Sequence, residues 1–120
     1  MNESTKQDRL ELYLQSEIQM RKGVLVYCVL LLCKGNKVYN SDIIRQLRDA
    51  HLIVVEGTLY ALLSRLARDK VLNYEWRESE HGPPRKYYSL TEEGENLLLA
   101  LGSSYRSLHK TVTQIEKGKS

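Results

Sequence analysis

Residues 56–66 of this 120-residue chain read EGTLYALLSRL, and the spacing of their leucines decides the fold. The spacing predicts a helix over about residues 56–70, because four leucines cluster within about 100° of arc on one side of it. The four are Leu59, Leu62, Leu63 and Leu66. The opposite side has aromatic, small, polar and basic residues without an acid, namely Tyr60, Ala61, Ser64, Arg65 and Arg68. Such a face suits a polyanion, and an ordinary solvated helix face is the alternative.

A second short helix precedes this one along the chain. We expect it over about residues 41–50, with the side chain of Asn40 or Ser41 capping its N-terminus. A short connector, Val54-Val55, joins it to the leucine-rich helix. Its buried stripe consists of Ile43, Ile44 and Leu47. Two short helices joined in this way are typical of a helix-turn-helix, in which the second helix lies in the major groove of DNA.

The N-terminal part of the chain is predicted to form a single long helix over residues 8–33. Apolar residues recur there at steps of three and four, and residues 24–32 are apolar on every side. Because a helix that is apolar all round must be covered all round, its C-terminal part is expected to run through the centre of the core. The sequence Lys34-Gly35-Asn36 ends this helix, since Gly35 can take the left-handed cap conformation.

A β-hairpin is expected after the leucine-rich helix. Residues 71–77 and 86–90 are predicted strands, and the polar, proline-containing residues between them form a loop. Arg77 precedes the loop, and Arg85 and Lys86 follow it. These three cations either contact DNA phosphates or serve as ordinary edge-strand charges that prevent aggregation.

The last helix begins after Thr91, whose side chain caps it, and acids occupy the first turn, where the helix dipole favours them. Its later residues step by four and three, as in the seam of a coiled coil. These are Leu101, Tyr105, Leu108, Val112 and Ile115. The predicted fold is therefore mainly α with a small β-hairpin, a winged helix-turn-helix with N- and C-terminal dimerisation helices. Residues 1–90 form the predicted DNA-binding domain with its N-terminal helix, and residues 91–120 form the C-terminal dimerisation helix.

A coiled-coil seam on a lone helix must be buried, and the first helix already covers the domain body. We therefore expect a two-fold homodimer, in which the last helix and the N-terminal half of the first helix pack against a second copy. The predicted dimer interface comprises Leu10, Leu14, Ile18, Leu101, Tyr105, Leu108, Val112 and Ile115. Packing of the final helix within one chain is the alternative.

The net charge of +3 is too small to indicate DNA binding on its own. Its location is informative, because residues 34–86 contain ten basic and seven acidic residues and so carry the whole excess. A modest charge is thereby concentrated on the part of the chain expected to face DNA, while the dimerisation helices are neutral.

The sequence argues against an enzyme, a membrane protein and a disulfide-stabilised protein. His51, His81 and His109 lie on three separate elements, and the sequence has no phosphate-binding loop or metal-ligand motif. No catalytic residue, metal or cofactor is therefore expected. Cys28 and Cys33 are five residues apart, which suits free thiols in a reducing interior. The longest apolar run is too short to span a bilayer, so we expect a cytoplasmic protein.

Several motifs resemble those of one family. Residues 56–66 resemble the signature of the PadR family of bacterial transcriptional regulators, as do WRES at 76–79, GPPRKYY at 82–88 and LTEEG at 90–94. The matched stretches and their spacings span about residues 24–101. The single closing helix resembles the short subfamily, which includes multidrug-binding repressors. The resemblance implies a ligand-responsive repressor that binds a palindromic operator on double-stranded DNA as a homodimer. A dimeric adaptor with the same fold but without affinity for DNA is the alternative.

The resemblance also implies which residues lie at or near DNA, and the outer helix face and the hairpin add to them. The predicted DNA-binding residues are Tyr39, Thr58, Tyr60, Ser64, Arg65, Arg68, Arg77, Arg85 and Lys86. Arginine is the usual reader of guanine, so Arg65 and Arg68 are expected at base edges. The phenols of Tyr39 and Tyr60 suit phosphate, whereas Thr58 is either a DNA contact or a capping or packing residue.

The short relatives hold flat aromatic ligands at the dimer interface with a tryptophan of the last helix, and the matching position here is Tyr105. Tyr105 is thus the candidate contact for a small aromatic effector, with filling of the dimer seam as the alternative. The chain departs from the family at Val55, where a capping Ser or Thr is common, at Ala61, where Pro is usual, and at Lys70, where Gly is frequent. Loss of the cap costs on the order of 1 kcal/mol, and Ala61 puts the operator preference in doubt.

Overall fold

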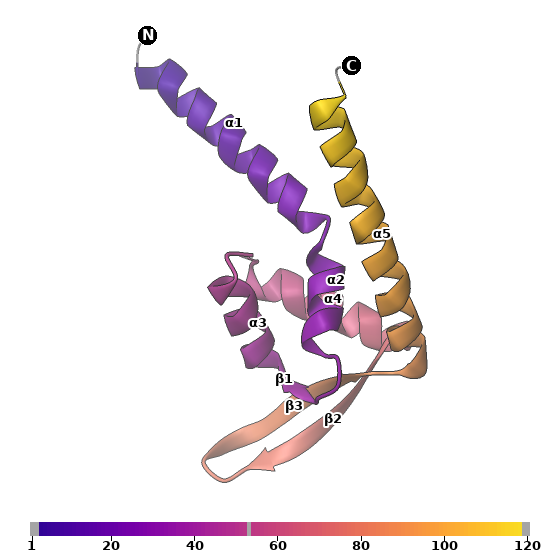
Figure 1. Cartoon of the computed structure of the whole chain (residues 1–120). Coiled ribbons are helices and arrows are strands. Elements are labelled where there is room, and N and C mark those ends of the chain that lie inside the picture. The colour runs from indigo at the N-terminus through magenta and orange to yellow at the C-terminus, as the bar shows by residue number, and fades with distance from the viewer. Residues whose placement is uncertain (1–2, 53, 119–120) are drawn as a thin grey trace.

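The computed structural model describes residues 3–52 and 54–118, and Figure 1 shows how their elements are arranged. The elements run in the order α1 (Glu3–Lys22), α2 (Leu25–Leu32), β1 (Val38–Tyr39), α3 (Asn40–Asp49), α4 (Glu56–Arg68), β2 (Leu72–Ser79), β3 (Gly82–Leu90) and α5 (Glu92–Lys117). A small antiparallel sheet and the helices α2 to α5 enclose the core, while α1 extends away from it. This is the predicted winged helix-turn-helix, with α3 and α4 as its two helices and the β2–β3 hairpin as its wing.

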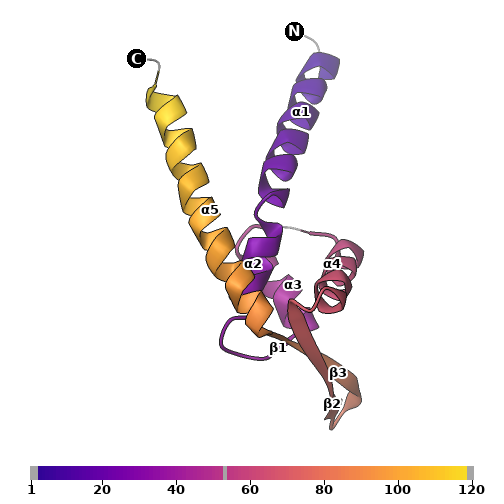
Figure 2. The same ribbon diagram turned by 90° about the vertical axis from the view of Figure 1, so that its right-hand side faces the viewer.

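The N-terminal helix is interrupted, so the prediction of one helix over residues 8–33 is wrong. α1 ends at Lys22 and α2 begins at Leu25. Between them, the amides of Gly23 and Val24 donate to carbonyls only three residues earlier, at 3.3 and 3.1 Å. Glycine is a poor helix former, and α1 has no buried residue that would hold the two segments in line. The interruption lets α1 leave the domain body at its own angle (Figure 1, Figure 2).

α2 supplies the centre of the core, as the sequence predicts. Val29 and Leu30 are fully buried, and Cys33, directly after the helix, is 1% exposed. The expectation that this helix is covered on every side is wrong at Leu31, which is 44% exposed. Both thiols are free, and burial raises the pKa of Cys33 to about 12 and raises that of Cys28 as well. The other core side chains are Val38, Ile43, Ile44, Leu47, Leu52, Leu59, Leu62, Leu63, Leu66, Leu72, Tyr88 and Leu98.

α3 buries the three residues of its predicted stripe. The predicted side-chain cap is wrong, because Tyr39 occupies the N-cap position without a side-chain hydrogen bond and Asn40 is already the first helical residue. Tyr39 also belongs to β1, a two-residue strand that is not predicted from the sequence, and it pairs there with Tyr87 of β3. Backbone pairing in the sheet therefore determines where α3 begins.

Three helix ends have a residue in the left-handed region, and one of these is His51, which follows the C-cap of α3 with a φ of 64°. Gly35 follows α2 with a φ of 79°, as predicted for the end of that helix. Lys70 follows α4 with a φ of 63°, a conformation that costs a non-glycine residue about 1 kcal/mol. Its amide donates to Ala67 O at 3.0 Å, and Val71 N donates to Leu66 O at 2.9 Å. These two bonds offset the cost and turn the chain from α4 into β2.

The wing is a longer and tighter hairpin than the sequence predicts. β2 runs to Ser79 and β3 starts at Gly82, so only Glu80 and His81 form the turn. The predicted loop over residues 78–84 is therefore wrong, because five of these seven residues belong to β2 and β3.

A bulge explains how Pro83 and Pro84 fit into β3. Between two regular pairs of the hairpin, β3 contributes both prolines where β2 contributes only Glu78. β1 pairs with β3 further along, at Tyr87 and Tyr88, so this part of β3 has no neighbour on its other side. Proline lacks an amide hydrogen, and it is tolerated where no sheet bond requires one.

Lys86 lies on the face of the wing that continues the core face of the sheet. It pairs with Trp76 across the hairpin, and its Nζ lies 4.2 Å from the centre of the Tyr74 ring. The centres of the Tyr88 and Trp76 rings lie 5.4 and 5.5 Å from the same atom. Cation–π contacts contribute about 0.5–1 kcal/mol at exposed sites. Lys86 therefore ties the two strands of the wing together.

Thr91 caps α5, as predicted. Its Oγ1 accepts a hydrogen bond from Gly94 N at 2.9 Å and donates to Lys70 O at 2.6 Å, which ties the start of α5 to the end of α4. Leu98 and Gly102 are buried against the domain body. Beyond them, residues 103–117 continue past the body. We call α1 and residues 103–117 the arms, and they diverge from the body (Figure 1, Figure 2).

Gly94→Ala is expected to destabilise the fold. An added Cβ would collide with the Val71 carbonyl oxygen and lie 3.2 Å from Leu90 Cδ2. We expect the free energy of unfolding to fall by about 2 kcal/mol, measured by urea denaturation followed by circular dichroism. Gly57→Ala is the matched control, because a Cβ there meets no described atom within 4 Å, and its stability should not fall. Equal stability of the two variants would contradict the close approach of α5 to Val71.

Lys86→Gln is expected to weaken the wing, because glutamine stays polar but removes the positive charge. The loss of the cation–π contacts should lower the free energy of unfolding by about 1 kcal/mol. Lys110→Gln makes the same charge change on an exposed part of α5 and should have no effect. Urea midpoints of both variants are compared in one buffer, and equal midpoints would rule out a stabilising role for the rings around Lys86.

Candidate DNA-binding surface

The outward face of α4 is the first part of the candidate surface. The four leucines of its predicted core face are buried, which leaves the opposite side of the helix in solvent. The residues exposed there are Thr58, Ala61, Ser64, Arg65 and Arg68. The sequence therefore predicts both faces of this helix correctly, apart from the residues at their boundary.

Three residues near this boundary have a burial or capping role that does not follow from helical spacing alone. Tyr60 is half-buried and packs against the core, because its large ring reaches past the edge of the outward face. Asp69, which at about 100° per residue falls beside the leucine face, is exposed and forms the C-cap. Thr58 is exposed in the first turn, and the N-cap is Val55 without a side-chain hydrogen bond. Thr58 therefore neither caps nor packs.

Six guanidinium groups have no ion pair within residues 3–52 and 54–118, and those of Arg9, Arg48 and Arg106 lie away from the candidate surface or on another element. The other three lie on the candidate surface, and they are those of Arg65 and Arg68 on α4 and of Arg85 on the wing. The ion pairs in this part of the chain lie instead within α1, within α3 and around Glu75 of the wing. An arginine without a carboxylate partner on an exposed face is available to a phosphate or to a base edge.

The outer face of the wing has a stack of two arginines and two tyrosines. Tyr39 and Tyr87 pair across β1 and β3, and their ring centres are 5.7 Å apart. The guanidinium carbon of Arg85 lies 4.8 Å from the centre of the Tyr39 ring, and that of Arg77 lies 4.7 Å from the centre of the Tyr87 ring. A guanidinium stacked on a ring keeps donors at its edge for an anion. The stack therefore holds two cations of the wing in place.

Arg85 and Lys86 do not form one basic patch, because neighbouring residues of a strand point to opposite faces. Arg85 stacks on Tyr39 on the outer face, whereas Lys86 lies among the rings of the inner face. Arg85 is exposed and Lys86 is half-buried, so Arg85 is the more accessible of the two.

Two charged residues of the outer face are absent from the sequence prediction. Lys37 Nζ lies 2.9 Å from Glu75 Oε1, and Arg77 Nη2 lies 2.8 Å from the same oxygen. The hydrogen bonds from Lys37 and from Arg77 lower the pKa of the Glu75 carboxyl. Lys37 precedes β1 and Glu75 lies in β2, so only the folded sheet brings them together. In the sequence, the only sign that Lys37 and Glu75 belong to this surface is that both lie in the charged segment 34–86.

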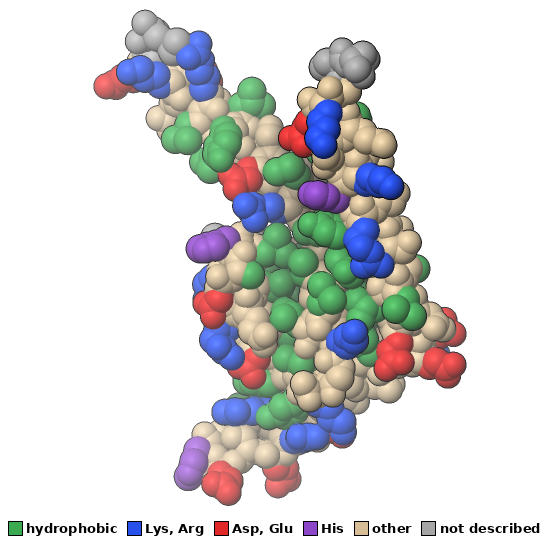
Figure 3. Space-filling model, viewed as in Figure 1, with side chains coloured by type: hydrophobic (Ala, Val, Ile, Leu, Met, Phe, Trp, Pro, Cys, Tyr) green, Lys and Arg blue, Asp and Glu red, His purple; other side chains and the backbone are tan. Residues whose placement is uncertain are grey.

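The arms carry all of the predicted dimer residues except Leu101, which lies just before the second arm. Those on the arms are 45–65% exposed, and Leu101 is half-buried against the core. α1 also exposes Leu12, Tyr13 and Met20, which the sequence prediction leaves out. Figure 3 shows hydrophobic side chains along α1 and over the body between the arms. The exposed members of the predicted set are Leu10, Leu14, Ile18, Tyr105, Leu108, Val112 and Ile115.

Tyr105 lies where the second arm leaves the domain body. Its ring centre is 5.6 Å from that of Tyr27 in α2, with an angle of 33° between the ring planes. Gly102, one turn earlier, is buried, and a Cβ there would lie 3.2 Å from the Tyr27 hydroxyl oxygen. α2 and α5 are thus joined by an aromatic pair, and Tyr105 is its exposed member.

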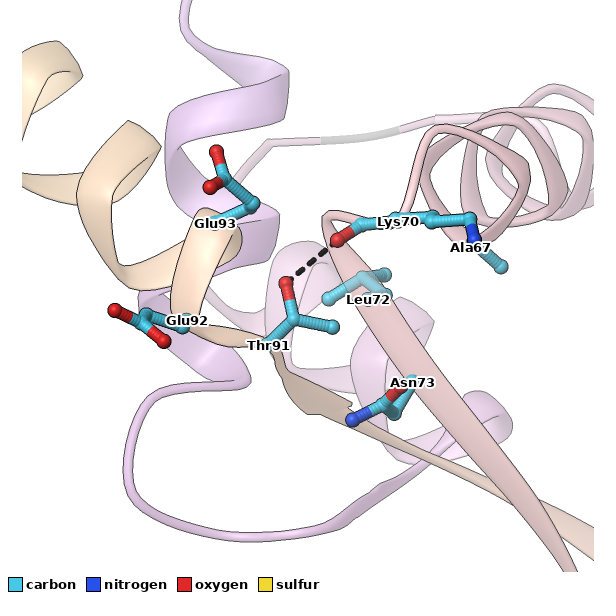
Figure 4. A pocket seen from close by; sticks show the side chains of 7 residues that line it. All are labelled: Ala67, Lys70, Leu72, Asn73, Thr91, Glu92 and Glu93. Carbon is cyan, nitrogen blue, oxygen red and sulfur yellow. Dashed lines mark hydrogen bonds between the residues drawn. The ribbon is translucent and has the colours of Figure 1, made fainter.

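No predicted site residue lines the surface pocket of about 430 Å³ at the junction of α4, β2 and α5 (Figure 4). Its lining is Ala67, Lys70, Leu72, Asn73, Thr91, Glu92 and Glu93. Within the part of the chain that the structure describes, no three His, Cys, Asp or Glu side chains are grouped so that they could hold a metal ion. No described helix combines the length and the hydropathy needed to cross a membrane.

Known proteins resemble the chain in sequence and in fold. The model of the Transcriptional regulator PadR-like family matches residues 29–100, which is more than half of the chain. A PadR-like transcription factor from Bacteroides fragilis is 54% identical, covers 84% of this chain and 98% of its own, and has a TM-score of 0.69. A PadR family transcriptional regulator from Eggerthella lenta is 27% identical over 91% of this chain and 96% of its own, with a TM-score of 0.84. No curated protein matches.

A structure of Bacillus subtilis PadR in complex with operator DNA shares the fold alone. It is 20% identical, covers 65% of this chain and 46% of its own, and has a TM-score of 0.60. The family match spans α4, the wing and the start of α5, which contain the motifs singled out in the sequence. The family consists of transcriptional regulators and not of enzymes, as the sequence analysis expects. The resemblance found in those motifs is confirmed, and the chain belongs to the PadR-like family of transcriptional regulators.

Proposed function

We propose that this regulator is a ligand-responsive repressor that binds a palindromic operator on double-stranded DNA as a homodimer. The observation that carries the proposal is the outward face of α4, where Arg65 and Arg68 are exposed and have no ion pair in the described residues. The fold shared with Bacillus subtilis PadR in complex with operator DNA supports it. A repressor of this kind acts in the cytoplasm, where it meets DNA.

In this proposal α4 lies in the major groove, and the wing contacts the DNA backbone. Arg65 and Arg68 contact base edges, where a guanidinium reads guanine. The other proposed contacts position the protein on the backbone, and they are Tyr39, Thr58, Tyr60, Ser64, Arg77, Arg85 and Lys86. Tyr60 and Lys86 are half-buried, so they act mainly by supporting the exposed contacts.

The apolar arms support the homodimer. In a single chain they leave a series of large apolar side chains in water, which favours burial against a partner. Two-fold symmetry buries the same surface on both copies and presents two α4 helices to a palindrome. In this proposal residues 91–120 are the dimerisation helix, and residues 1–90 are the DNA-binding part with α1 as a second dimer element. Leu98 of α5 belongs to the core, so the two parts are packed together.

Tyr105 is the proposed contact for a small aromatic effector. Its ring is 45% exposed and lies beside Tyr27, so a flat ligand between the copies can stack on this pair. Filling of the dimer seam is the alternative role of the same ring. A ligand that favours one arrangement of the arms changes the spacing of the two α4 helices and thereby the affinity for the operator.

Arg65→Ala and Arg85→Ala should separate base reading from backbone contact. Arg65→Ala should weaken binding to the operator by about 1–3 kcal/mol and binding to a random duplex much less. Arg85→Ala should weaken both to a similar degree and reduce the salt dependence of binding by about one phosphate contact. Filter binding to the DNA upstream of the protein's own gene, over a range of salt concentrations, measures both effects.

Lys110→Ala is the control for these two variants, because it removes an exposed cation from residues 103–117, the part of α5 that continues past the domain body (Figure 1). The same loss of specificity in Arg65→Ala and Arg85→Ala would contradict the assigned roles. Wild-type protein that binds no duplex at low salt, with or without candidate aromatic ligands, would favour the adaptor without DNA affinity.

Leu108→Asp should convert the homodimer into monomers, because it places a charge in the apolar seam of the second arm. Leu99→Asp is the matched control. Leu99 lies nine residues earlier, which at about 100° per residue is the opposite side of α5, and it is 72% exposed. Analytical ultracentrifugation should show dimers for the wild type and the control. A dimeric Leu108→Asp variant would place the interface elsewhere.

A further inference from the structure

One carboxylate engages two cations on the outer face of the wing. Glu75 Oε1 accepts a hydrogen bond from Lys37 Nζ at 2.9 Å and another from Arg77 Nε at 2.8 Å. The side chains of Glu75, Lys37 and Arg77 are 41–50% exposed, so a large ligand can reach all three. Neither cation has a second carboxylate partner in the described residues. Removal of the charge on Glu75 would therefore leave two cations without an ion pair.

Arg77 has a second support that does not depend on Glu75. Its guanidinium stacks on the Tyr87 ring, which in turn contacts the Tyr39 ring. Its position on the outer face is thus partly maintained by aromatic contacts even without the carboxylate. Glu75 neutralises this cation, but it is not the sole residue that places it.

Arg85 is a cation of the same face that has no carboxylate partner in the described residues. It pairs directly with Arg77 across the hairpin, and its guanidinium stacks on Tyr39. The outer face therefore presents three cations, Lys37, Arg77 and Arg85, of which two share one acid. Such an arrangement suits a polyanion, yet Glu75 reduces its strength.

We propose that Glu75 limits the affinity of the wing for DNA by competing with backbone phosphates for Lys37 and Arg77. The proposal rests on the DNA binding proposed above. A carboxylate and a phosphate accept hydrogen bonds from a guanidinium in the same way, so a phosphate gains these donors only by displacing Glu75. The competition weakens binding to every sequence and leaves the base contacts of α4 unchanged. Glu75 thereby lowers the sequence-independent part of the binding free energy.

The test is Glu75→Gln, which keeps the size of the side chain and removes its charge. Affinity for a duplex of random sequence should rise about tenfold at ~0.1 M salt, because Lys37 and Arg77 become available to phosphates. The plot of log affinity against log salt should become steeper by up to about 1.8, the value for two additional phosphate contacts. The ratio of operator affinity to random-duplex affinity should stay unchanged, because the wing contacts the backbone of both duplexes in the same way. Filter binding over a series of salt concentrations measures all three quantities.

Glu78→Gln is the matched control, because it makes the same charge change on the same wing. Glu78 is exposed and has no ion pair in residues 3–52 and 54–118, so its salt slope should change less than half as much. Lys37→Gln should have little effect in the wild type, where Glu75 occupies Lys37. In the Glu75→Gln background the same change should flatten the slope again. Circular dichroism verifies that each variant is folded.

The possible outcomes separate this inference from the proposed function. A wild type that binds no duplex at low salt means that the proposed function fails. A wild type that binds, together with a folded Glu75→Gln variant whose affinity is unchanged or reduced, overturns the inference and leaves Glu75 as a structural partner. If Glu75→Gln does not fold, Lys37→Gln alone decides, because a marked loss of wild-type affinity would show that Glu75 does not withhold Lys37 from DNA.

Discussion

The burial of one leucine face of α4 is the constraint on which the rest of the molecule depends. Each buried leucine contributes about 2 kcal/mol from the removal of its side chain from water, and four of them define one side of the helix. Arg65 and Arg68 must then face solvent. The left-handed turn at Lys70 directs the chain into β2, and the hydrogen bond from Thr91 to that turn places the start of α5. The outward face, the wing and the second arm all follow from this buried stripe.

Periodicity predicts the parts of this fold that depend on neighbours along the chain. α3, α4 and α5, their buried stripes and the Thr91 cap are of this kind, because a turn of helix brings the relevant residues together. β1 and the length of the wing depend on pairing across the sheet, which a two-residue strand and a proline-containing segment do not reveal. The break at Gly23 is not predicted, because a single glycine within a pattern of helical spacing is a weak signal against a helix.

The residues of the candidate surface also fall into two groups, those whose exposure follows from neighbours along the chain and those whose contacts depend on pairing across the sheet. Arg65 and Arg68 could be placed from helical spacing alone, because their exposure follows from the leucines opposite them. The roles of Lys37 and Arg85 depend on strand register, and a count of charges treats them alike. The structure pairs Lys37 with a carboxylate and stacks Arg85 on a tyrosine ring. The net charge of +3 therefore does not tell which cations are accessible to DNA. The contacts of each cation in the folded sheet do.

The chain has one tryptophan, and it lies in the wing beside Lys86. Trp76 is 62% exposed, so its indole senses both the surrounding water and the neighbouring ammonium group. No second indole elsewhere in the sequence contributes a competing signal. The tryptophan emission of the unlabelled protein, excited where the eight tyrosines absorb little, is thus an optical record of one structural element, and it distinguishes events at the wing from events at α4 or the arms.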